Sequence, residues 1–346
     1  MAVMSNATAR IGIAGAGSVG CFVGGGLAGF APVTLLGRPR VRELLDKHGL
    51  RLTDLDGRER TLAPGEVQVA TGPEALACAA LVLVTVKSAD TAALAAQLAP
   101  VLRPDTVVVS LQNGMHNVSV LREQLPQQVV LPGVVAFNVV HRGHGWLHRA
   151  TSGGLMVARH PGLTPFLPAF DKAGLPVQQR DDMVQVQWAK LLFNLNNAVN
   201  ALSDLPLRDE LALRTYRHCW ALLQEEALQA LDAAGIRPAR LFAVPPHWLP
   251  RLLRLPDALF RPLAGRLLAT GPLARSSTWE DLAAGRSTEV DHFNGEIVRL
   301  AQSHGLKAPA NARIVALVRQ AARGDRRVWH RDELWRELSQ VAATQG

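Results

Sequence analysis

The chain of 346 residues is 48% hydrophobic and 19% charged, a composition that allows one large or two smaller packed domains and excludes a disordered protein. Its net charge of +8 is spread along the sequence and only 5% of the residues are aromatic, which favours anionic small molecules over nucleic acid as partners. The three cysteines are far apart and no secretion signal precedes Ile11, so we expect a cytoplasmic protein without a disulfide framework.

The first predicted element is a buried strand at 11–14, and a glycine-rich turn and a helix follow it directly. This glycine spacing is typical of dinucleotide-binding units: the first glycine permits the turn, the second admits a pyrophosphate, and the third lets helix and strand pack closely. Unpaired N–H groups and the dipole at the helix start then favour the anion. The residues expected at the cofactor here are Gly15, Gly17, Ser18, Val19 and Gly20.

The next predicted strand, 32–36, bears on the choice between NAD and NADP. Its end lacks the Asp or Glu that usually holds the ribose of NAD, and the loop after it contains Arg38 and Arg40. These could be solvated loop charges, but after a dinucleotide fingerprint an arginine suits the 2′-phosphate of NADP. No charged residue lies between Arg10 and Arg38, yet the glycines and Pro32 indicate strand, turn and helix rather than a membrane span.

The rest of the first half alternates strands with helices. Residues 50–53 and 60–62 flank an Asp-Gly pair that is typical of a hairpin turn. The apolar run 81–86 predicts a central parallel strand. The other expected strands are 67–69, 106–110, 129–137 and 155–158, with helices at 40–48 and 90–102. This alternation predicts a doubly wound α/β domain of the Rossmann type over residues 1–181.

Polar residues follow two of the central strands. Lys87 comes directly after the strand 81–86, and a Gln-Asn-Gly sequence at 112–114 follows the strand 106–110. Either could be a solvated helix start or an ordinary turn. Because open α/β sheets bind ligands beyond the carboxyl ends of their strands, we expect Lys87 and Asn113 to face a nicotinamide or a substrate.

From about residue 182 helical periodicity replaces the strand signals, which indicates an all-helical domain over 182–346. The expected helices are 182–202, 212–234, 278–284, 288–304 and 310–322. The segment 245–272 is rich in proline, leucine and arginine, so we expect short helices that form a packing surface, a lid or a dimer contact. A helix on a membrane surface is the less favoured alternative.

The first of these helices carries Lys190 and Asn194 four residues apart, so they share one helix face. A lysine among apolar neighbours is unusual unless it has a partner or reaches solvent. Ser277 precedes Glu280 by three residues, which predicts a capping box at the start of a helix. Glu289, near the expected start of the next helix, would suit the helix dipole.

Together these motifs resemble the ketopantoate reductase (2-dehydropantoate 2-reductase) family over nearly the whole chain. The most specific part is Ser277, followed twelve residues later by Glu289 and then by Asn294 and Gly295. The resemblance implies a Rossmann domain followed by a helical domain. It also implies the NADPH-dependent reduction of 2-dehydropantoate to pantoate, an oxidoreductase step of pantothenate biosynthesis.

The resemblance makes Lys190 the general acid and Glu289 a supporting carboxylate that also reaches the cofactor. Hydride delivery to a ketone leaves negative charge on oxygen, which an ammonium group stabilises and then protonates. The residues implied at the substrate are Lys87, Asn113, Asn194 and Ser277, the last at its carboxylate. Lys87 and Asn113 are also implied at the cofactor, together with Arg38.

The chain departs from the family pattern at two positions. Ala198 stands where the family has a second substrate asparagine, and Asn196, Asn197 and Asn200 lie nearby but cannot all face the same way. Arg208 stands near a further family asparagine and could pair with an additional anionic group. The exact 2-oxo acid therefore stays open. A related dehydrogenase of the opine or 3-hydroxy-acid type and an NADPH-binding sensor without turnover are the alternatives.

Two further expectations concern partners. His141, His144 and His148 lie among glycines and arginines without an acidic co-ligand, so we predict no metal site. We expect a small anionic substrate, no nucleic acid and no membrane. The resemblance leaves a homodimer open.

Overall fold

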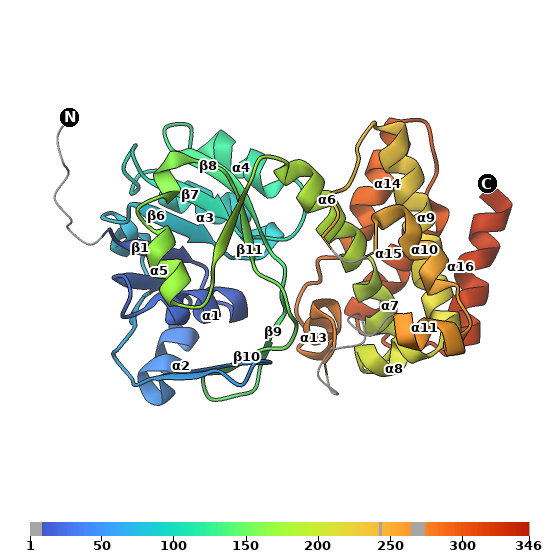
Figure 1. Cartoon of the computed structure of the whole chain (residues 1–346), viewed down its shortest axis with the longest axis horizontal. Coiled ribbons are helices and arrows are strands. Elements are labelled where there is room, and N and C mark those ends of the chain that lie inside the picture. Colours follow the sequence, from blue (N-terminus) through green and yellow to red (C-terminus); the bar gives the residue numbers. More distant parts are fainter. Residues whose placement is uncertain (1–8, 242–243, 264–273, 346) are drawn as a thin grey trace. The chain divides into compact units, whose positions relative to one another are not determined.

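The protein is described by a computed structural model that covers residues 9–241, 244–263 and 274–345. The chain divides into two compact units, residues 1–183 and 184–346, and each is described by itself below. Figure 1 labels the helices and strands along the chain.

The N-terminal unit is built on an eight-stranded sheet with the order β12-β11-β8-β7-β6-β1-β2-β5. Its strands are β1 (Ile11–Ala14), β2 (Val33–Leu36), β5 (Gln68–Ala70), β6 (Leu81–Val84), β7 (Val107–Ser110), β8 (Val129–Val135), β11 (Leu155–Ala158) and β12 (Val177–Arg180). Neighbouring strands are parallel except β11, which runs antiparallel to β8.

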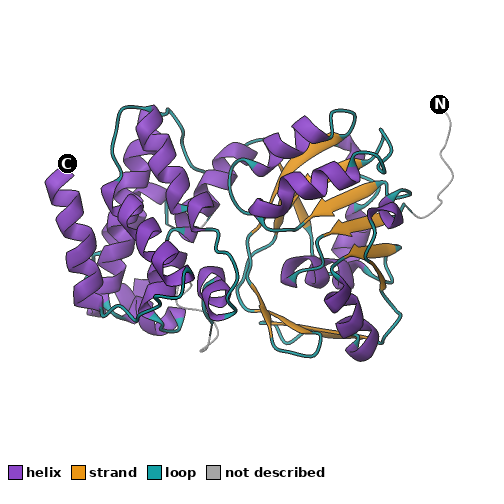
Figure 2. Ribbon diagram, turned by 180° about the vertical axis from the view of Figure 1, so that it is seen from behind, coloured by secondary structure: helices purple, strands orange, loops and turns teal. Residues whose placement is uncertain are grey.

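Helices cover both faces of this sheet, which confirms the predicted doubly wound Rossmann-type fold (Figure 2). On β6, Leu81 and Leu83 face one apolar core while Val82 and Val84 face the other, as expected for a strand buried on both sides. Helices α1 (Ser18–Leu27), α2 (Pro39–His48) and α5 (Leu167–Lys172) contribute to the first core, and α3 (Thr91–Leu98) and α4 (Asn117–Gln124) to the second. The apolar run thus forms a central strand, although it ends two residues earlier than predicted.

A separate four-stranded sheet has the order β4-β3-β10-β9. Its strands are β3 (Leu50–Asp54), β4 (Glu59–Leu62), β9 (Val139–His141) and β10 (Trp146–Arg149). The predicted hairpin is confirmed, because Leu50 pairs with Leu62 in an antiparallel register. Strands β9 and β10 were not predicted, and they carry His141 and His148. Within the described ranges no group of three or more His, Cys, Asp or Glu side chains is placed to hold a metal ion.

All secondary-structure elements in the described residues of the C-terminal unit are helices or 3₁₀ turns. Its helices are α6 (Met183–Asn194), α7 (Asn196–Ser203), α8 (Leu207–Ala212), α9 (Arg214–Ala233), α10 (Leu249–Leu253), α11 (Asp257–Leu263), α13 (Ser277–Ala283), α14 (Asn294–Ser303), α15 (Pro309–Ala322) and α16 (Arg331–Gln345). Helix α9 packs against α10, α14 and α16, and its Trp220 and Leu223 are buried in the core. None of the helices in the described part of the chain combines the length and hydropathy that a bilayer span requires.

Two helix predictions need correction. The helix expected at 182–202 is interrupted at Leu195, where two consecutive asparagines, which are weak helix formers, follow. The helix expected at 288–304 begins only at Asn294, because Phe293 has the non-helical dihedrals φ −111° and ψ −86°. The short helices expected in the proline-rich segment are confirmed for its described part, where a 3₁₀ turn (Pro246–Trp248) precedes α10 and α11. Residues 264–272 lie outside the described ranges.

Candidate active site

The glycine-rich turn between β1 and α1 has three glycines with three different surroundings. Gly15 has φ +120°, and a Cβ added there would lie 2.7 Å from the backbone nitrogen of Val86. A Cβ on Gly20 would lie 2.1 Å from the backbone oxygen of Gly15. At Gly17 no described atom lies within 4 Å of the added Cβ. Gly15 and Gly20 are therefore required by the fold itself, whereas the space at Gly17 is available to a ligand.

Helix α1 begins at Ser18 with Gly17 as its N-cap, which offers no side chain for capping, and its first turn contains no acidic residue. The N–H groups of Ser18, Val19 and Gly20 have no acceptor within the helix, because the first turn lacks preceding carbonyls. These N–H groups and the positive end of the helix dipole, with no acidic side chain in the first turn, form a suitable binding site for a pyrophosphate.

The end of β2 lies against this turn. The backbone N–H groups of Gly15 and Ala16 both donate to Leu36 O, at 3.1 and 2.9 Å. A Cβ added to Gly37 would meet Ala16 Cβ at 2.7 Å, so the chain passes closely there. Arg38 follows as the N-cap residue of α2, and its exposed side chain forms an ion pair with Asp90 at 3.3 Å.

The carboxyl ends of β6 and β7 are tied together by side-chain hydrogen bonds. The backbone oxygen of Asn113 accepts from Ser88 Oγ at 3.0 Å and from Asn117 Nδ2 at 2.5 Å. Asn117 also accepts from Thr91 Oγ1 at 2.9 Å. These contacts bring the turn that contains Asn113 beside the segment that begins with Lys87, and both side chains are partly buried.

In the C-terminal unit, Lys190 and Asn194 lie on α6, one turn apart. The Lys190 side chain keeps partial access to solvent, yet protein atoms surround it densely. This burial lowers the pKa of Lys190 from its usual 10.5 to about 8, because desolvation disfavours the ammonium form. An amine with this pKa can donate a proton at neutral pH more readily than an ordinary lysine.

The start of α13 differs from the predicted capping box. The N-cap is Ser276, whose Oγ accepts from the backbone N–H of Trp279 at 3.2 Å. Ser277 is therefore the first helical residue, and Glu280 is one position too late to complete a capping box with Ser276. Ser276 is buried, whereas Ser277 is exposed. The Ser277 hydroxyl accepts from Asn197 Nδ2 at 3.4 Å.

Glu289 is also placed differently from the prediction. It precedes a short 3₁₀ turn (Val290–His292) rather than the first turn of α14, and it is 9% exposed. Glu289 therefore does not lie in the first turn of α14, where the dipole interaction was expected. Asn294 and Gly295, from the same motif, form the buried beginning of α14.

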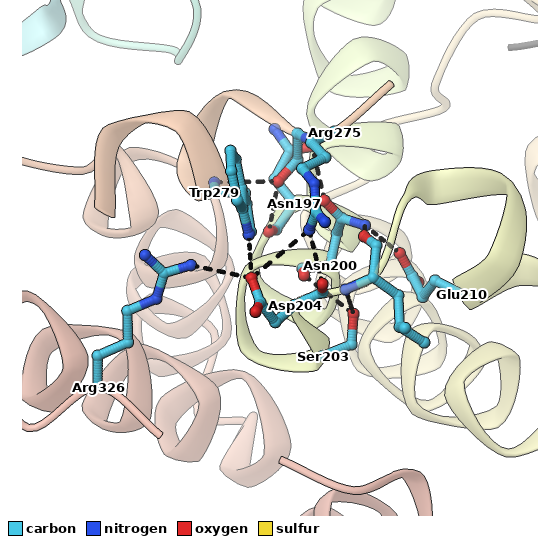
Figure 3. A network of polar contacts seen from close by, with 10 residues as sticks. Asn197, Asn200, Ser203, Asp204, Glu210, Arg275, Trp279 and Arg326 are labelled. Carbon is cyan, nitrogen blue, oxygen red and sulfur yellow. Dashed lines mark hydrogen bonds and ion pairs between the residues drawn. The ribbon is translucent and has the colours of Figure 1, made fainter. Parts of the chain in front are cut away.

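A buried polar network supports α7 (Figure 3). Asn196 and Asn200 both donate to Glu210 Oε2, at 3.4 and 2.8 Å. Burial raises the pKa of Glu210 from 4.5 to about 8, although the two amide donors act in the opposite direction. Asn200 Oδ1 also accepts from the backbone N–H of Ser276 at 2.8 Å. The network therefore fixes the start of α13 to α7.

Asp204 makes a second connection between α7 and α13. It ends α7 in the left-handed conformation with φ +56°. Its carboxylate accepts from Trp279 Nε1 at 2.5 Å and pairs with Arg326 at 3.1 Å. The guanidinium of Arg275 lies over the Trp279 ring at 4.2 Å from its centroid. The two contacts of Asp204, drawn in Figure 3, therefore tie the end of α7 to Trp279 on α13 and to Arg326.

Comparisons with known proteins identify the family of this chain. Two family profiles match the chain: one described as ketopantoate reductase PanE/ApbA covers residues 11–162, and its C-terminal counterpart covers residues 182–322. The chain belongs to the ketopantoate reductase family. A 2-dehydropantoate 2-reductase of Halobacterium salinarum is 32% identical over 330 residues, which span 91% of this chain and 99% of that protein.

Solved structures show the same family and fold. A PanE/ApbA family ketopantoate reductase from Ralstonia eutropha JMP134 is 31% identical with a TM-score of 0.77, and the match covers 92% of this chain and 100% of that one. A D-mandelate dehydrogenase in complex with NADH and anilino(oxo)acetate has a TM-score of 0.74 over 91% of this chain and 99% of its own. At 19% identity it shows the fold alone. The ketopantoate reductase family comprises NAD(P)-dependent oxidoreductases, and this chain is one of them.

In this member of the ketopantoate reductase family, the departure at Ala198 lies on α7. Ala198 is 1% exposed and points into the core of the helical unit. Arg208, by contrast, is exposed on α8. Sequence reasoning did not single out Asn117 or Glu210. Each lies in a helix with several other polar residues, so the sequence offers no signal that either side chain is buried or which partner it has.

Proposed function

We propose that this chain catalyses the NADPH-dependent reduction of a 2-oxo acid to a 2-hydroxy acid, with 2-dehydropantoate as the favoured substrate and pantoate as product. The observation that carries this proposal is the placement of Lys190 and Asn194 one turn apart on α6, in a chain whose other unit presents an open glycine turn at a helix start. Burial also lowers the pKa of Lys190 to about 8. In this proposal residues 1–181 bind the dinucleotide and residues 182–346 bind the substrate.

The residues of the N-terminal unit fit a dinucleotide. Gly15, Gly17 and the N–H groups at the start of α1 would hold the pyrophosphate. Arg38 would bind the 2′-phosphate of NADPH, and Lys87 and Asn113 would lie near the nicotinamide ribose and the substrate. When bound, the nicotinamide supplies a hydride to the carbonyl carbon of the substrate.

Lys190 would carry the acid step. Its ammonium group stabilises the negative charge that develops on the carbonyl oxygen and then transfers one proton to that oxygen. Asn194 and Ser277 would orient the substrate, Ser277 at its carboxylate, and Glu289 would support the site as a carboxylate. The product is a hydroxyl group, and Lys190 is left neutral until solvent reprotonates it.

The choice of cofactor is tested at Arg38. Replacement by alanine removes the guanidinium group and the ion pair with Asp90. We expect Arg38→Ala to weaken NADPH binding about tenfold or more while NADH binding changes little, because only NADPH carries the 2′-phosphate. Equal losses for the two cofactors would remove Arg38 from 2′-phosphate recognition.

The function itself is tested by a panel of oxo acids with both cofactors, followed by the consumption of NADPH or NADH. Turnover of 2-dehydropantoate with NADPH supports the proposal. Faster turnover of another oxo acid would favour a related dehydrogenase, the alternative to which Ala198 points. Tight NADPH binding without any turnover would favour a sensor. A cytoplasmic location and a homodimer stay predictions, the latter checked by light scattering of the purified protein.

A further inference from the structure

One face of the α6–α7 segment keeps access to solvent. Within residues 188–203, Lys190, Phe193 and Asn197 are partly exposed, and every other position is buried. Leu195, between the two helices, keeps helical dihedrals of φ −58° and ψ −27°, so the helical rotation continues through the interruption. At about 100° per residue, positions three and seven after Lys190 lie about 60° and 20° from it around the axis. The three residues therefore form one stripe.

Asn197 is paired on this stripe with Ser277, a residue of the proposed substrate site. Asn197 Nδ2 donates to Ser277 Oγ at 3.4 Å. Because Ser277 Oγ accepts this bond, its own O–H can donate to an acceptor outside the pair. The Asn197 amide has a second N–H, so two donors lie side by side at a surface that also presents Lys190.

Buried hydrogen bonds hold the backbone next to this pair, and two of the residues concerned, Asn197 and Asn200, are labelled in Figure 3. Ser276 Oγ donates to the backbone oxygen of Asn197 at 3.0 Å, and the backbone N–H of Ser276 donates to Asn200 Oδ1 at 2.8 Å. These two hydrogen bonds fix the backbone of α7 at Asn197 relative to the start of α13, where Ser277 follows Ser276. Donors fixed in advance bind a ligand with a smaller loss of conformational entropy.

We propose that Asn197 is a substrate-binding residue, whose amide N–H and the Ser277 O–H together bind the carboxylate of the oxo acid. This inference rests on the proposed function, because it takes the ligand to be a 2-oxo acid. Ala198 does not take part, since its side chain carries no hydrogen-bonding group. The chain thus presents its second amide one position earlier than the family pattern would place it.

The test compares Asn197→Ala with a matched control, Gln302→Ala, which removes an exposed amide elsewhere in the same unit. Loss of a hydrogen bond to a charged group typically weakens binding about 10- to 100-fold. We expect Asn197→Ala to raise the KM for the oxo acid by about that factor, with the KM for NADPH and the thermal midpoint unchanged. Gln302→Ala should leave all three unchanged.

Two more variants distinguish a substrate-binding role of Asn197 from a purely structural role in linking α7 to α13. Asn197→Asp places an anion beside Ser277 and should raise the KM for the oxo acid further than alanine does. Asn197→Ser retains a donor and should recover part of the affinity, and it replaces the alanine variant if that one unfolds. In the Asn197→Ala/Ser277→Ala double variant the KM should rise by less than the product of the single effects.

The outcomes distinguish this inference from the proposed function. If the unmodified protein reduces an oxo acid and all Asn197 variants keep its KM, Asn197 is not a substrate ligand, and the proposed function stands. If the unmodified protein reduces none of the oxo acids, both fail together. A KM that rises only in step with a loss of thermal stability, and that serine does not restore, would also overturn the role of Asn197.

Discussion

Lys190 should set the upper pH limit of the reduction. With a pKa of about 8 in the free protein, its ammonium form falls from about 99% at pH 6 to about 1% at pH 10. Because the reduction consumes that proton, kcat/KM for the oxo acid should be flat below about pH 7 and fall about tenfold per pH unit above about pH 9. An anionic substrate favours the charged amine, so the decline of kcat should begin at higher pH than that of kcat/KM.

The assay is the initial rate of NADPH consumption at saturating cofactor and constant ionic strength. Lys190→Ala should lower kcat by about 10²–10⁴ and remove the alkaline decline, with the affinity for NADPH little changed. Lys307→Ala removes an exposed lysine of the same unit and is the matched control. A kcat/KM that stays constant up to about pH 10, or a Lys190→Ala variant with comparable turnover, would refute the role of Lys190 as the acid.

The same pKa has a consequence for stability. The unfolded chain keeps the Lys190 proton up to about its usual pKa of 10.5, whereas the folded protein releases it near 8. Between these values the unfolded state binds more protons, so the free energy of unfolding should rise with pH, by about 3 kcal/mol in total from this group. Urea unfolding across this interval should show the rise in the unmodified protein and not in Lys190→Ala.

The remaining predictions concern the scaffold. Gly17→Ala should fold normally but bind NADPH at least tenfold more weakly, because the added methyl group fills only space that a ligand would occupy. Gly20→Ala should destabilise the fold, because its Cβ would meet Gly15 O at 2.1 Å. Thermal unfolding and NADPH titration of both variants check these two expectations. Burial holds the pKa of Glu210 near 8, so between about pH 4.5 and 8 the folded state retains a proton that the unfolded state has lost, and the free energy of unfolding should fall with rising pH by at most about 5 kcal/mol. Glu210→Gln should remove that slope in urea unfolding, and an unchanged slope would assign the titration to another group. Ser276→Ala should lower the free energy of unfolding by about 1–2 kcal/mol through loss of the N-cap, and no loss on thermal or urea unfolding would contradict the capping role.

The fold of the N-terminal unit was largely predictable because its signals are local. A strand such as 11–14 and the glycines after it are adjacent in sequence, and an apolar run such as 81–86 is explained by burial on both faces. Strand β10 was missed although its antiparallel pairing with β9 is local; its other pairing, with β3, is not local. Trp146 pairs with Arg51 in parallel, across more than 90 residues, and no pattern within either strand records that partner.

The candidate site was less predictable because adjacent residues of the same type have different roles there, and burial decides which role each has. Ser276 and Ser277 are chemically identical, but only the packing of α13 on α7 makes the first a cap and leaves the second exposed. The asparagines of α7 divide in the same way: Asn196 and Asn200 are four residues apart and reach Glu210, whereas Asn197 reaches Ser277. Helical periodicity predicts that Asn196 and Asn200 share one face and that Asn197 lies on another. It does not predict which face is buried, because that depends on Glu210, which another helix contributes. Ala198 therefore removes the amide that the family pattern has at that position, while Asn197, the preceding residue, still presents an amide on an adjacent part of the helix surface.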